Sequence, residues 1–228
     1  MRDIPAFTGL PLRLSDATIR CYLRLENRKG TILMKQFSRL AGSVIAVLAV
    51  GVFLSANPSQ AIESIAKQAI LIDTATGAVL FGKEADTPMP PSSMSKMMTV
   101  YMLFERLRDG SLTMDDTFLV SENAWRKGGA KSGGSTMFLI PGKRVRIEDL
   151  IRGSIGQSGN DAWIVVAEGL ASSEEAFAEE MTARAREIGL KNSVFRNSTG
   201  WPDPEHLTTA RDLAILAQRT IEDFPEYY

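Results

Sequence analysis

The stretch SMSK at residues 93–96 decides the fold, because it places a serine three residues before a lysine at the predicted start of a helix. Residues at positions i and i+3 share one face of a helix. A lysine amine on that face can take the proton of the serine hydroxyl and so activate a nucleophile for acyl transfer. The pattern is common by chance, and SIAK at residues 64–67 is a second match. The surroundings must therefore decide between the two.

The sequence on either side of residues 93–96 predicts that this motif starts a helix and is partly buried. The segment PMPP at residues 88–91 stops regular structure, and the predicted helix runs from Ser93 to Arg108 before Gly110 ends it. Its methionine-rich face is predicted to pack into the core and to shield Lys96 from water, which would lower the pKa of the amine. The competing interpretation is that Ser93 is only a helix cap and Lys96 a solvated lysine. The flanking methionines are Met94, Met97 and Met98.

A second candidate element is SGN at residues 158–160, in the break between a helix that starts at Ile147 and one that runs from Asp161 to Leu170. A hydroxyl and a carboxamide projecting from a tight turn can relay a proton and hold an amide substrate. The plain alternative is a turn that links two helices, with Asn160 or Asp161 as its cap.

The remaining pattern is a hairpin followed by helices. Residues 68–73 and 78–81 read as strands, with Gly77 in the turn. The strand edges call for further partners, because a two-stranded sheet is marginal in water. Further helix starts are expected at Ser121 and at two capping boxes. These boxes pair Ser172 with Glu175 and Thr209 with Asp212.

The N-terminal part has the order of a secretory signal. A short basic segment precedes an uncharged apolar run at residues 40–54, and small residues at Ser59 and Ala61 predict cleavage after Ala61. The run is short for a membrane-spanning helix, which needs about 20 residues. We therefore expect a non-native extension over residues 1–33, a signal peptide over 34–61 that begins at Met34, and a mature chain over 62–228.

Charge and cysteine content indicate which partners and which compartment to expect. The chain carries 26 basic and 27 acidic residues, and its basic excess falls within residues 1–61. No basic patch with interleaved aromatic residues is evident, so nucleic acid is not expected as a partner. The single cysteine, Cys21, precedes the predicted mature chain. The mature chain would therefore need no disulfide in an extracytoplasmic compartment.

Together, these motifs resemble the low-molecular-mass penicillin-binding proteins, which are serine-type D-alanyl-D-alanine carboxypeptidases of the bacterial cell wall. The resemblance covers about residues 66–228. It rests on AILID at 69–73, TGAVL at 76–80, PSSMSKMMT at 91–99, QSGNDA at 157–162 and TARD at 209–212.

The resemblance implies a fold, a mechanism and partners. The fold is α+β and β-lactamase/transpeptidase-like, with an antiparallel sheet, flanking helices and a helical subdomain. Ser93 would attack the bond between the terminal D-alanines of a peptidoglycan pentapeptide, with Lys96 as base, Ser158 as proton relay and Asn160 holding the substrate amide. β-Lactam antibiotics would trap Ser93, and no cofactor or metal is implied. The protein would act in the periplasm or another extracytoplasmic space.

One departure from the family is large. The family's third motif, K-T-G, should lie on a strand after Asp212, and no match follows it. KSG at residues 131–133 precedes Ser158 in a Gly-rich loop and is rejected. We therefore expect a fragment that holds only the first hairpin of the sheet and the helical part, with little activity, because one lost oxyanion donor costs about 100- to 1,000-fold. The family's later β-rich domain and C-terminal membrane-associating helix would also be missing.

Other functional classes fit less well. The sole histidine, His206, lies in the segment WPDPEH and reads as a loop residue, and no G-x-S-x-G elbow is present. Too few histidines and cysteines are present for a zinc peptidase. No E-x-x-L-N-like segment follows Ser158, which disfavours a class A β-lactamase. A D,D-endopeptidase of the same family and an inactive peptidoglycan-binding fragment or pseudoenzyme stay open. It is also open whether Arg126, Lys127 and the Gly-rich loop gate the site, with a solvated surface loop as the plainer interpretation.

Overall fold

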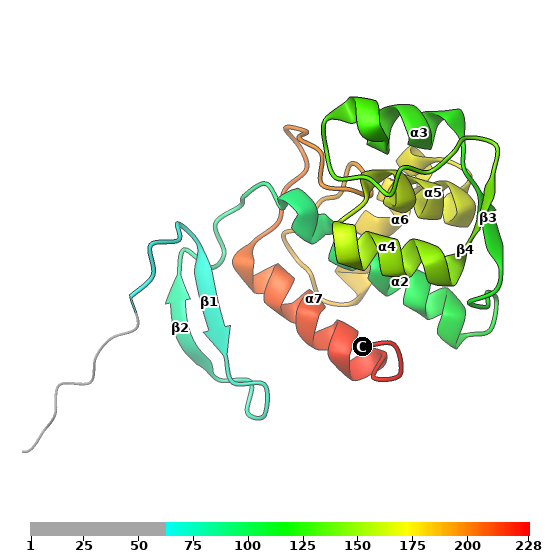
Figure 1. Ribbon diagram of the computed structural model, residues 1–228. Coiled ribbons are helices and arrows are strands. Elements are labelled where there is room, and N and C mark those ends of the chain that lie inside the picture. The colour runs from blue at the N-terminus through cyan, green and yellow to red at the C-terminus, as the bar shows by residue number, and fades with distance from the viewer. Residues whose placement is uncertain (1–62) are drawn as a thin grey trace, which may run out of the picture. The chain divides into compact units, whose positions relative to one another are not determined.

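The computed structural model describes residues 63–228, in which a hairpin is followed by helices and by a second short pair of strands (Figure 1). The architecture is therefore α+β, as predicted. The second sheet is a correction, because the sequence indicated one hairpin only. In chain order the elements are β1 (Ala69–Ile72), β2 (Val79–Lys83), the 3₁₀ turn η1 (Ser92–Ser95), α2 (Lys96–Arg108), β3 (Thr117–Leu119), α3 (Glu122–Gly128), the 3₁₀ turn η2 (Ala130–Ser132), β4 (Arg144–Arg146), α4 (Ile147–Gln157), α5 (Asn160–Ala171), α6 (Glu174–Glu187) and α7 (Ala210–Asp223).

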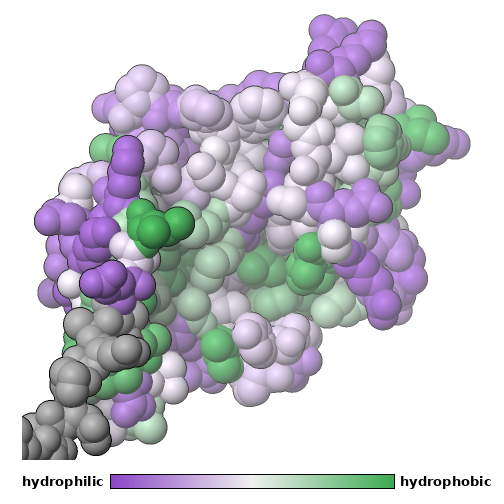
Figure 2. Space-filling view, turned by 60° about the vertical axis from the view of Figure 1, so that its left-hand side comes forward, coloured by the Kyte–Doolittle hydropathy of each residue, from purple (hydrophilic) through white to green (hydrophobic). Residues whose placement is uncertain are grey.

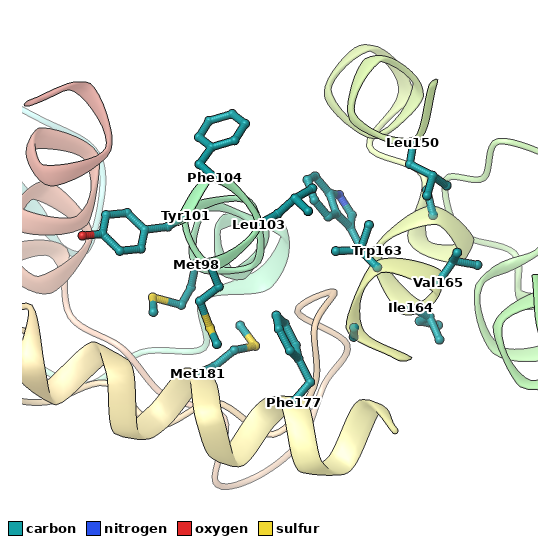
Figure 3. Close-up of a cluster of buried hydrophobic side chains, with 14 of the residues drawn as sticks. Met98, Tyr101, Leu103, Phe104, Leu150, Trp163, Ile164, Val165, Phe177 and Met181 are labelled. Carbon is teal, nitrogen blue, oxygen red and sulfur yellow. The ribbon is translucent and has the colours of Figure 1, made fainter. Parts of the chain in front are cut away.

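Helix α2 lies at the centre of the core and contacts α5, α6 and α7 (Figure 3). Figure 3 shows Tyr101 directed toward α7 and Met98 toward Met181 of α6. The Tyr101 hydroxyl donates to Asp223 of α7 at 2.7 Å. Burying one large apolar side chain contributes about 1.5–3 kcal/mol, so this contact surface fixes the start of α2 in place.

Helix α5 is buried on nearly all sides, from Asp161 to Ala167. A helix that is apolar all round occupies the middle of a domain. Its run AWIVVA explains that position, and the polar contacts of α5 lie on either side of this run, at Asp161 and at Glu168, which accepts from Asn123 Nδ2 at 2.7 Å.

The β1–β2 hairpin is antiparallel, with Ala69 opposite Lys83 and an irregularity after Leu71. Its turn depends on Gly77, whose φ of 72° favours glycine. Figure 2 brings this side of the molecule forward and shows apolar surface gathered on it. The exposed apolar residues of the hairpin are Leu71, Val79 and Leu80.

The observed helix starts confirm some of the predicted helix caps and correct others. Ser121 caps α3 and Thr209 caps α7, as expected. The first predicted box is wrong, because Ser173 caps α6 and Ser172 ends α5 with a φ of 68°. The second box is half right, because the Asp212 carboxylate bonds to the segment before α7 instead of returning to Thr209.

The expected extension and signal peptide, residues 1–33 and 34–61, lie outside the described residues. Within residues 63–228, no helix combines the length and the apolar character needed to cross a bilayer.

Candidate active site

The SMSK motif lies at the junction of η1 and α2, and not within a continuous α-helix as predicted. Ser93 occupies the 3₁₀ turn, and Lys96 is the first residue of α2. A 3₁₀ turn repeats every three residues, so it still aligns positions i and i+3. The turn is held from outside by Gly200, at which a Cβ would lie 1.8 Å from the Ser92 carbonyl oxygen. Any larger residue at that position would displace the turn.

Lys96 joins the two candidate serines. Its Nζ lies 3.4 Å from Ser93 Oγ and donates to both Oγ and the carbonyl oxygen of Ser158 at 2.8 Å. These three oxygens match the three donors of an ammonium group. The structure therefore brings together three of the four residues that the sequence singled out.

Burial sets the electrostatics of Lys96. The residue is 7% exposed, and this desolvation lowers its pKa below the usual value of 10.5. A lowered pKa raises the fraction of neutral amine at a given pH, and only the neutral amine can accept a proton. The prediction that the flanking methionines face the core holds for Met98, which is buried, and in part for Met97, which is half-buried. It is wrong for Met94, which is 43% exposed.

Ser158 takes an uncommon backbone conformation. It ends α4 with φ 57° and ψ 35°, in the left-handed region that non-glycine residues seldom adopt. This turn separates α4 from α5 and directs the Ser158 hydroxyl to Lys96. The predicted break between the two helices is therefore confirmed, and strain of this kind is often retained at functional sites.

Asn160 opens α5 and is 9% exposed. Its backbone N–H donates to the Ser135 carbonyl at 2.8 Å. Its Nδ2 approaches Gly134 so closely that a Cβ there would lie 2.6 Å away. The Gly-rich loop thus packs against the candidate site, although the sequence favoured a solvated loop. Among residues 63–228, none hydrogen-bonds the Asn160 carboxamide, which leaves it available to a ligand.

Asp161 fixes this loop in place and was missed as a site residue. Its fully buried carboxylate accepts from the Thr136 hydroxyl at 2.7 Å and from the N–H groups of Met137 and Leu139 at 2.8 and 3.0 Å. It also accepts from Ala162 N–H at 3.0 Å in the first turn of α5. A carboxylate at a helix start is favoured by the helix dipole, and that is the signal the sequence offered.

His206 is a loop residue, as predicted, yet it is buried beneath the serine turn. Its Nε2 lies 2.8 Å from Ser95 Oγ, and both residues are at most 1% exposed. Burial lowers the pKa of His206 to about 4, so the ring is neutral near pH 7. Nothing in the sequence links His206 to Ser95, which lies 111 residues away.

The arrangement sets one hydroxyl and a second hydroxyl on the same desolvated amine, which are the groups that an acylation step would use. Ser64 and Lys67, the second match to the motif, lie outside any helix. Within residues 63–228, no three His, Cys, Asp or Glu side chains gather as metal ligands would.

Comparisons with known proteins identify the family of the chain. The Peptidase_S11 family model, described as D-alanyl-D-alanine carboxypeptidase, matches residues 55–228. The Escherichia coli (strain K12) carboxypeptidase DacC is 38% identical over 202 residues, which cover 86% of this chain and 50% of DacC. The Bacillus subtilis carboxypeptidase DacF is 39% identical over 69% of this chain and 39% of its own length.

Solved structures share the fold. The D-alanyl-D-alanine carboxypeptidase DacD from Francisella tularensis aligns with a TM-score of 0.70 at 37% identity, over 75% of this chain and 40% of its own. Penicillin-binding protein 5 from Haemophilus influenzae aligns with a TM-score of 0.69 at 35% identity, over 73% of this chain and 48% of its own. The chain thus spans half or less of the length of these relatives.

Proposed function

The chain belongs to the S11 family of D-alanyl-D-alanine carboxypeptidases, and we propose that the complete protein hydrolyses the terminal D-Ala-D-Ala bond of peptidoglycan stem peptides. The reaction proceeds through an acyl-enzyme at Ser93. The observation that carries the proposal is the buried Lys96 amine, which lies within reach of the hydroxyls of both Ser93 and Ser158.

In the acylation step, neutral Lys96 takes the proton of Ser93 Oγ as this oxygen bonds to the carbonyl carbon between the two D-alanines. The C–N bond then breaks, and the departing D-alanine amine receives a proton from Lys96 through the Ser158 hydroxyl. The 2.8 Å contact between Lys96 Nζ and Ser158 Oγ supports this relay.

In the deacylation step, a water molecule bonds to the acyl carbon and gives one proton to Lys96. The ester bond breaks, and Ser93 Oγ regains a proton from Lys96. The shortened peptide leaves with a free carboxyl group, which gives up its proton to water. Asn160 holds the substrate amide through its carboxamide, which faces the Gly-rich loop from the start of α5.

The same proposal includes the cellular location of the protein and its inhibitors. Residues 34–61 direct export, and the catalytic region acts outside the cytoplasm on the cell wall, with a peripheral attachment to the membrane. β-Lactams acylate Ser93 because their strained amide occupies the place of the D-Ala-D-Ala bond.

Release of D-alanine from an acyl-D-Ala-D-Ala peptide tests this function. We expect Ser93→Ala to abolish release, whereas Ser64→Ala, in the second match to the motif, should leave it unchanged. Ser64 is a suitable control because, among residues 63–228, its hydroxyl hydrogen-bonds only with Ala66 N–H, in an exposed segment. Equal release by both variants would refute the role of Ser93.

A D,D-endopeptidase is the second candidate. A D-alanyl-D-alanine endopeptidase from Pseudomonas aeruginosa is 27% identical over 150 residues. Incubation with a cross-linked muropeptide dimer separates the two activities, since an endopeptidase yields monomers and a carboxypeptidase yields D-alanine with the dimer intact.

A further inference from the structure

The loop that joins α6 to α7 passes along the start of α2 and holds it on both sides of the SMSK motif (Figure 1). Before the motif, Met89 and Thr208 exchange two backbone hydrogen bonds of 2.8 and 2.9 Å. After it, the Thr99 hydroxyl donates to the Ser198 carbonyl at 2.8 Å. Both anchors lie outside residues 93–96, so the side chains of the turn itself depend on another contact.

His206 supplies that contact from the same loop. Its Nε2 lies 2.8 Å from Ser95 Oγ, within hydrogen-bond distance, and the donor depends on the tautomer of the ring. Ser95 is fully buried, and among residues 63–228 its hydroxyl has no other hydrogen-bond partner. The ring lies edge-on to Phe195, with the two centroids 5.6 Å apart. His206 is therefore fixed on one side and holds Ser95 on the other.

Packing alone does not account for a histidine at this position. Its Nδ1 is buried and has no hydrogen-bond partner among residues 63–228. A buried polar atom without a partner is destabilising, and an apolar ring of similar size would avoid that cost. An apolar ring could not bond to Ser95, however, so this contact is what the histidine adds.

The charge state of His206 suits a constant contact. Burial lowers the pKa of the ring to about 4. The charged groups that face it oppose each other, since Asp203 raises this pKa and Arg196 lowers it. A neutral ring can stay buried without a counter-ion. The bond to Ser95 therefore persists through the neutral and alkaline range in which acylation is measured.

The turn that contains Ser95 sets the geometry of the reacting pair. Ser95 is the last residue of η1 and lies between Ser93 and Lys96 in the sequence. Lys96 Nζ lies 3.4 Å from Ser93 Oγ, at the long end of hydrogen-bond distances, so a small rotation of η1 would separate the two atoms. Such a rotation would also open a path for water to Lys96, which is 7% exposed.

We propose that His206 is a positioning residue for the acylation of Ser93. Through Ser95 it holds η1 in the rotation that keeps the Ser93 hydroxyl within reach of the Lys96 amine and keeps water away from that amine. This inference rests on the proposed function, because it takes Ser93 as the nucleophile and Lys96 as its base.

The test measures the second-order rate constant for acylation of the complete protein by a fluorescent penicillin, as a function of pH. His206→Phe keeps an aromatic ring and loses Nε2, so it should slow acylation about 10- to 100-fold. It should also move the plateau of the rate–pH profile upward by about one pH unit, because water reaches Lys96 and the pKa of the amine rises toward 10.5. A variant that is merely less stable would lose active protein without moving this plateau.

Further variants separate the hydrogen bond from the volume of the ring. Glutamine places its amide near the position of Nε2, and asparagine near that of Nδ1. His206→Gln should therefore keep the rate within about threefold of wild type, whereas His206→Asn should be as slow as His206→Phe. Ser95→Ala removes the other partner and should slow acylation to a similar extent. The double variant His206→Phe/Ser95→Ala should be no slower than the slower single variant, since both substitutions remove the same contact.

A matched control and the double variant make the outcomes distinct. Ser154→Ala removes an equally buried hydroxyl, which has no hydrogen-bond partner among residues 63–228, and should leave the rate and the pH profile unchanged. If His206→Phe unfolds, Ser95→Ala still decides, because it removes a single oxygen atom. Wild-type rates and pH profiles in these two variants, or effects that multiply in the double variant, would overturn the positioning role alone. Failure of the wild-type protein to be acylated would overturn the proposed function as well.

Discussion

Two segments of this chain carry the same S-x-x-K spacing in opposite surroundings. Residues 64–67 lie in an exposed, irregular segment, where the Ser64 hydroxyl accepts from Ala66 N–H and Lys67 faces solvent. Residues 93–96 lie at the start of the central helix, where Lys96 is 7% exposed and contacts Ser93 and Ser158.

The difference shows what the spacing alone does not provide. A helical turn must bring the serine and the lysine to one face, and the core must remove water from the amine. Only residues 93–96 meet both conditions. Substitutions that remove one condition at a time can therefore break or sharpen the contrast.

The largest effect is expected from the lysines themselves. Lys96→Ala should slow acylation by a β-lactam about 10³- to 10⁴-fold, because the Ser93 hydroxyl loses its base. Lys67→Ala should leave the rate unchanged. Lys96→Arg should be as slow as Lys96→Ala, since a guanidinium stays protonated. Stopped-flow measurement with a fluorescent penicillin gives these rates, and an active Lys96→Arg would contradict the role of a neutral amine.

A smaller loss is expected when the second hydroxyl is removed. Ser158→Ala should slow acylation about 100-fold, because the proton relay is lost while Lys96 keeps its contact with the Ser158 carbonyl. Ser158→Gly is the matched variant, since it also removes the hydroxyl but relieves the left-handed backbone. If the two variants retain the wild-type rate, the relay is wrong.

A loss of stability is expected when the Gly-rich loop that packs on Asn160 loses the carboxylate that anchors it. Asp161→Asn should lower the free energy of unfolding by about 2 kcal/mol, because the carboxylate that accepts four hydrogen bonds loses its charge and one acceptor. Asp73→Asn should change it much less, because the Asp73 carboxylate accepts from Ala75 N–H and the Thr76 hydroxyl in an exposed turn. Urea unfolding measures both, and equal effects would show that Asp161 does not hold the loop.

The smallest effect is expected from pH. Burial lowers the pKa of Lys96, so the neutral fraction of the amine rises with pH and levels off above that lowered pKa, before pH 10.5. The acylation rate should rise at most tenfold per pH unit and reach its plateau below pH 10.5. A rate–pH profile that keeps rising past pH 10.5 would mean that Lys96 is not desolvated.

Much of the fold could be predicted from local patterns. The hairpin turn at Gly77, the caps at Ser121 and Thr209 and the break after α4 all depend on residues close together in the chain. The β3–β4 sheet was missed because its strands have three residues each, too few for a period-two pattern to stand out.

The site was predictable only in part. Ser93, Lys96, Ser158 and Asn160 follow from motifs, whereas the packing of Asp161 and His206 depends on contacts between distant segments. His206, for example, meets Ser95 across 111 residues. Pattern along the chain carries no signal for such a contact.

The most direct test of the contrast is to map the covalent adduct of a fluorescent penicillin by tandem mass spectrometry. The account predicts a single adduct on Ser93, absent from Ser93→Ala and unaffected by Ser64→Ala. An adduct on Ser64, or none on the folded protein, would contradict the assignment of Ser93 as the nucleophile.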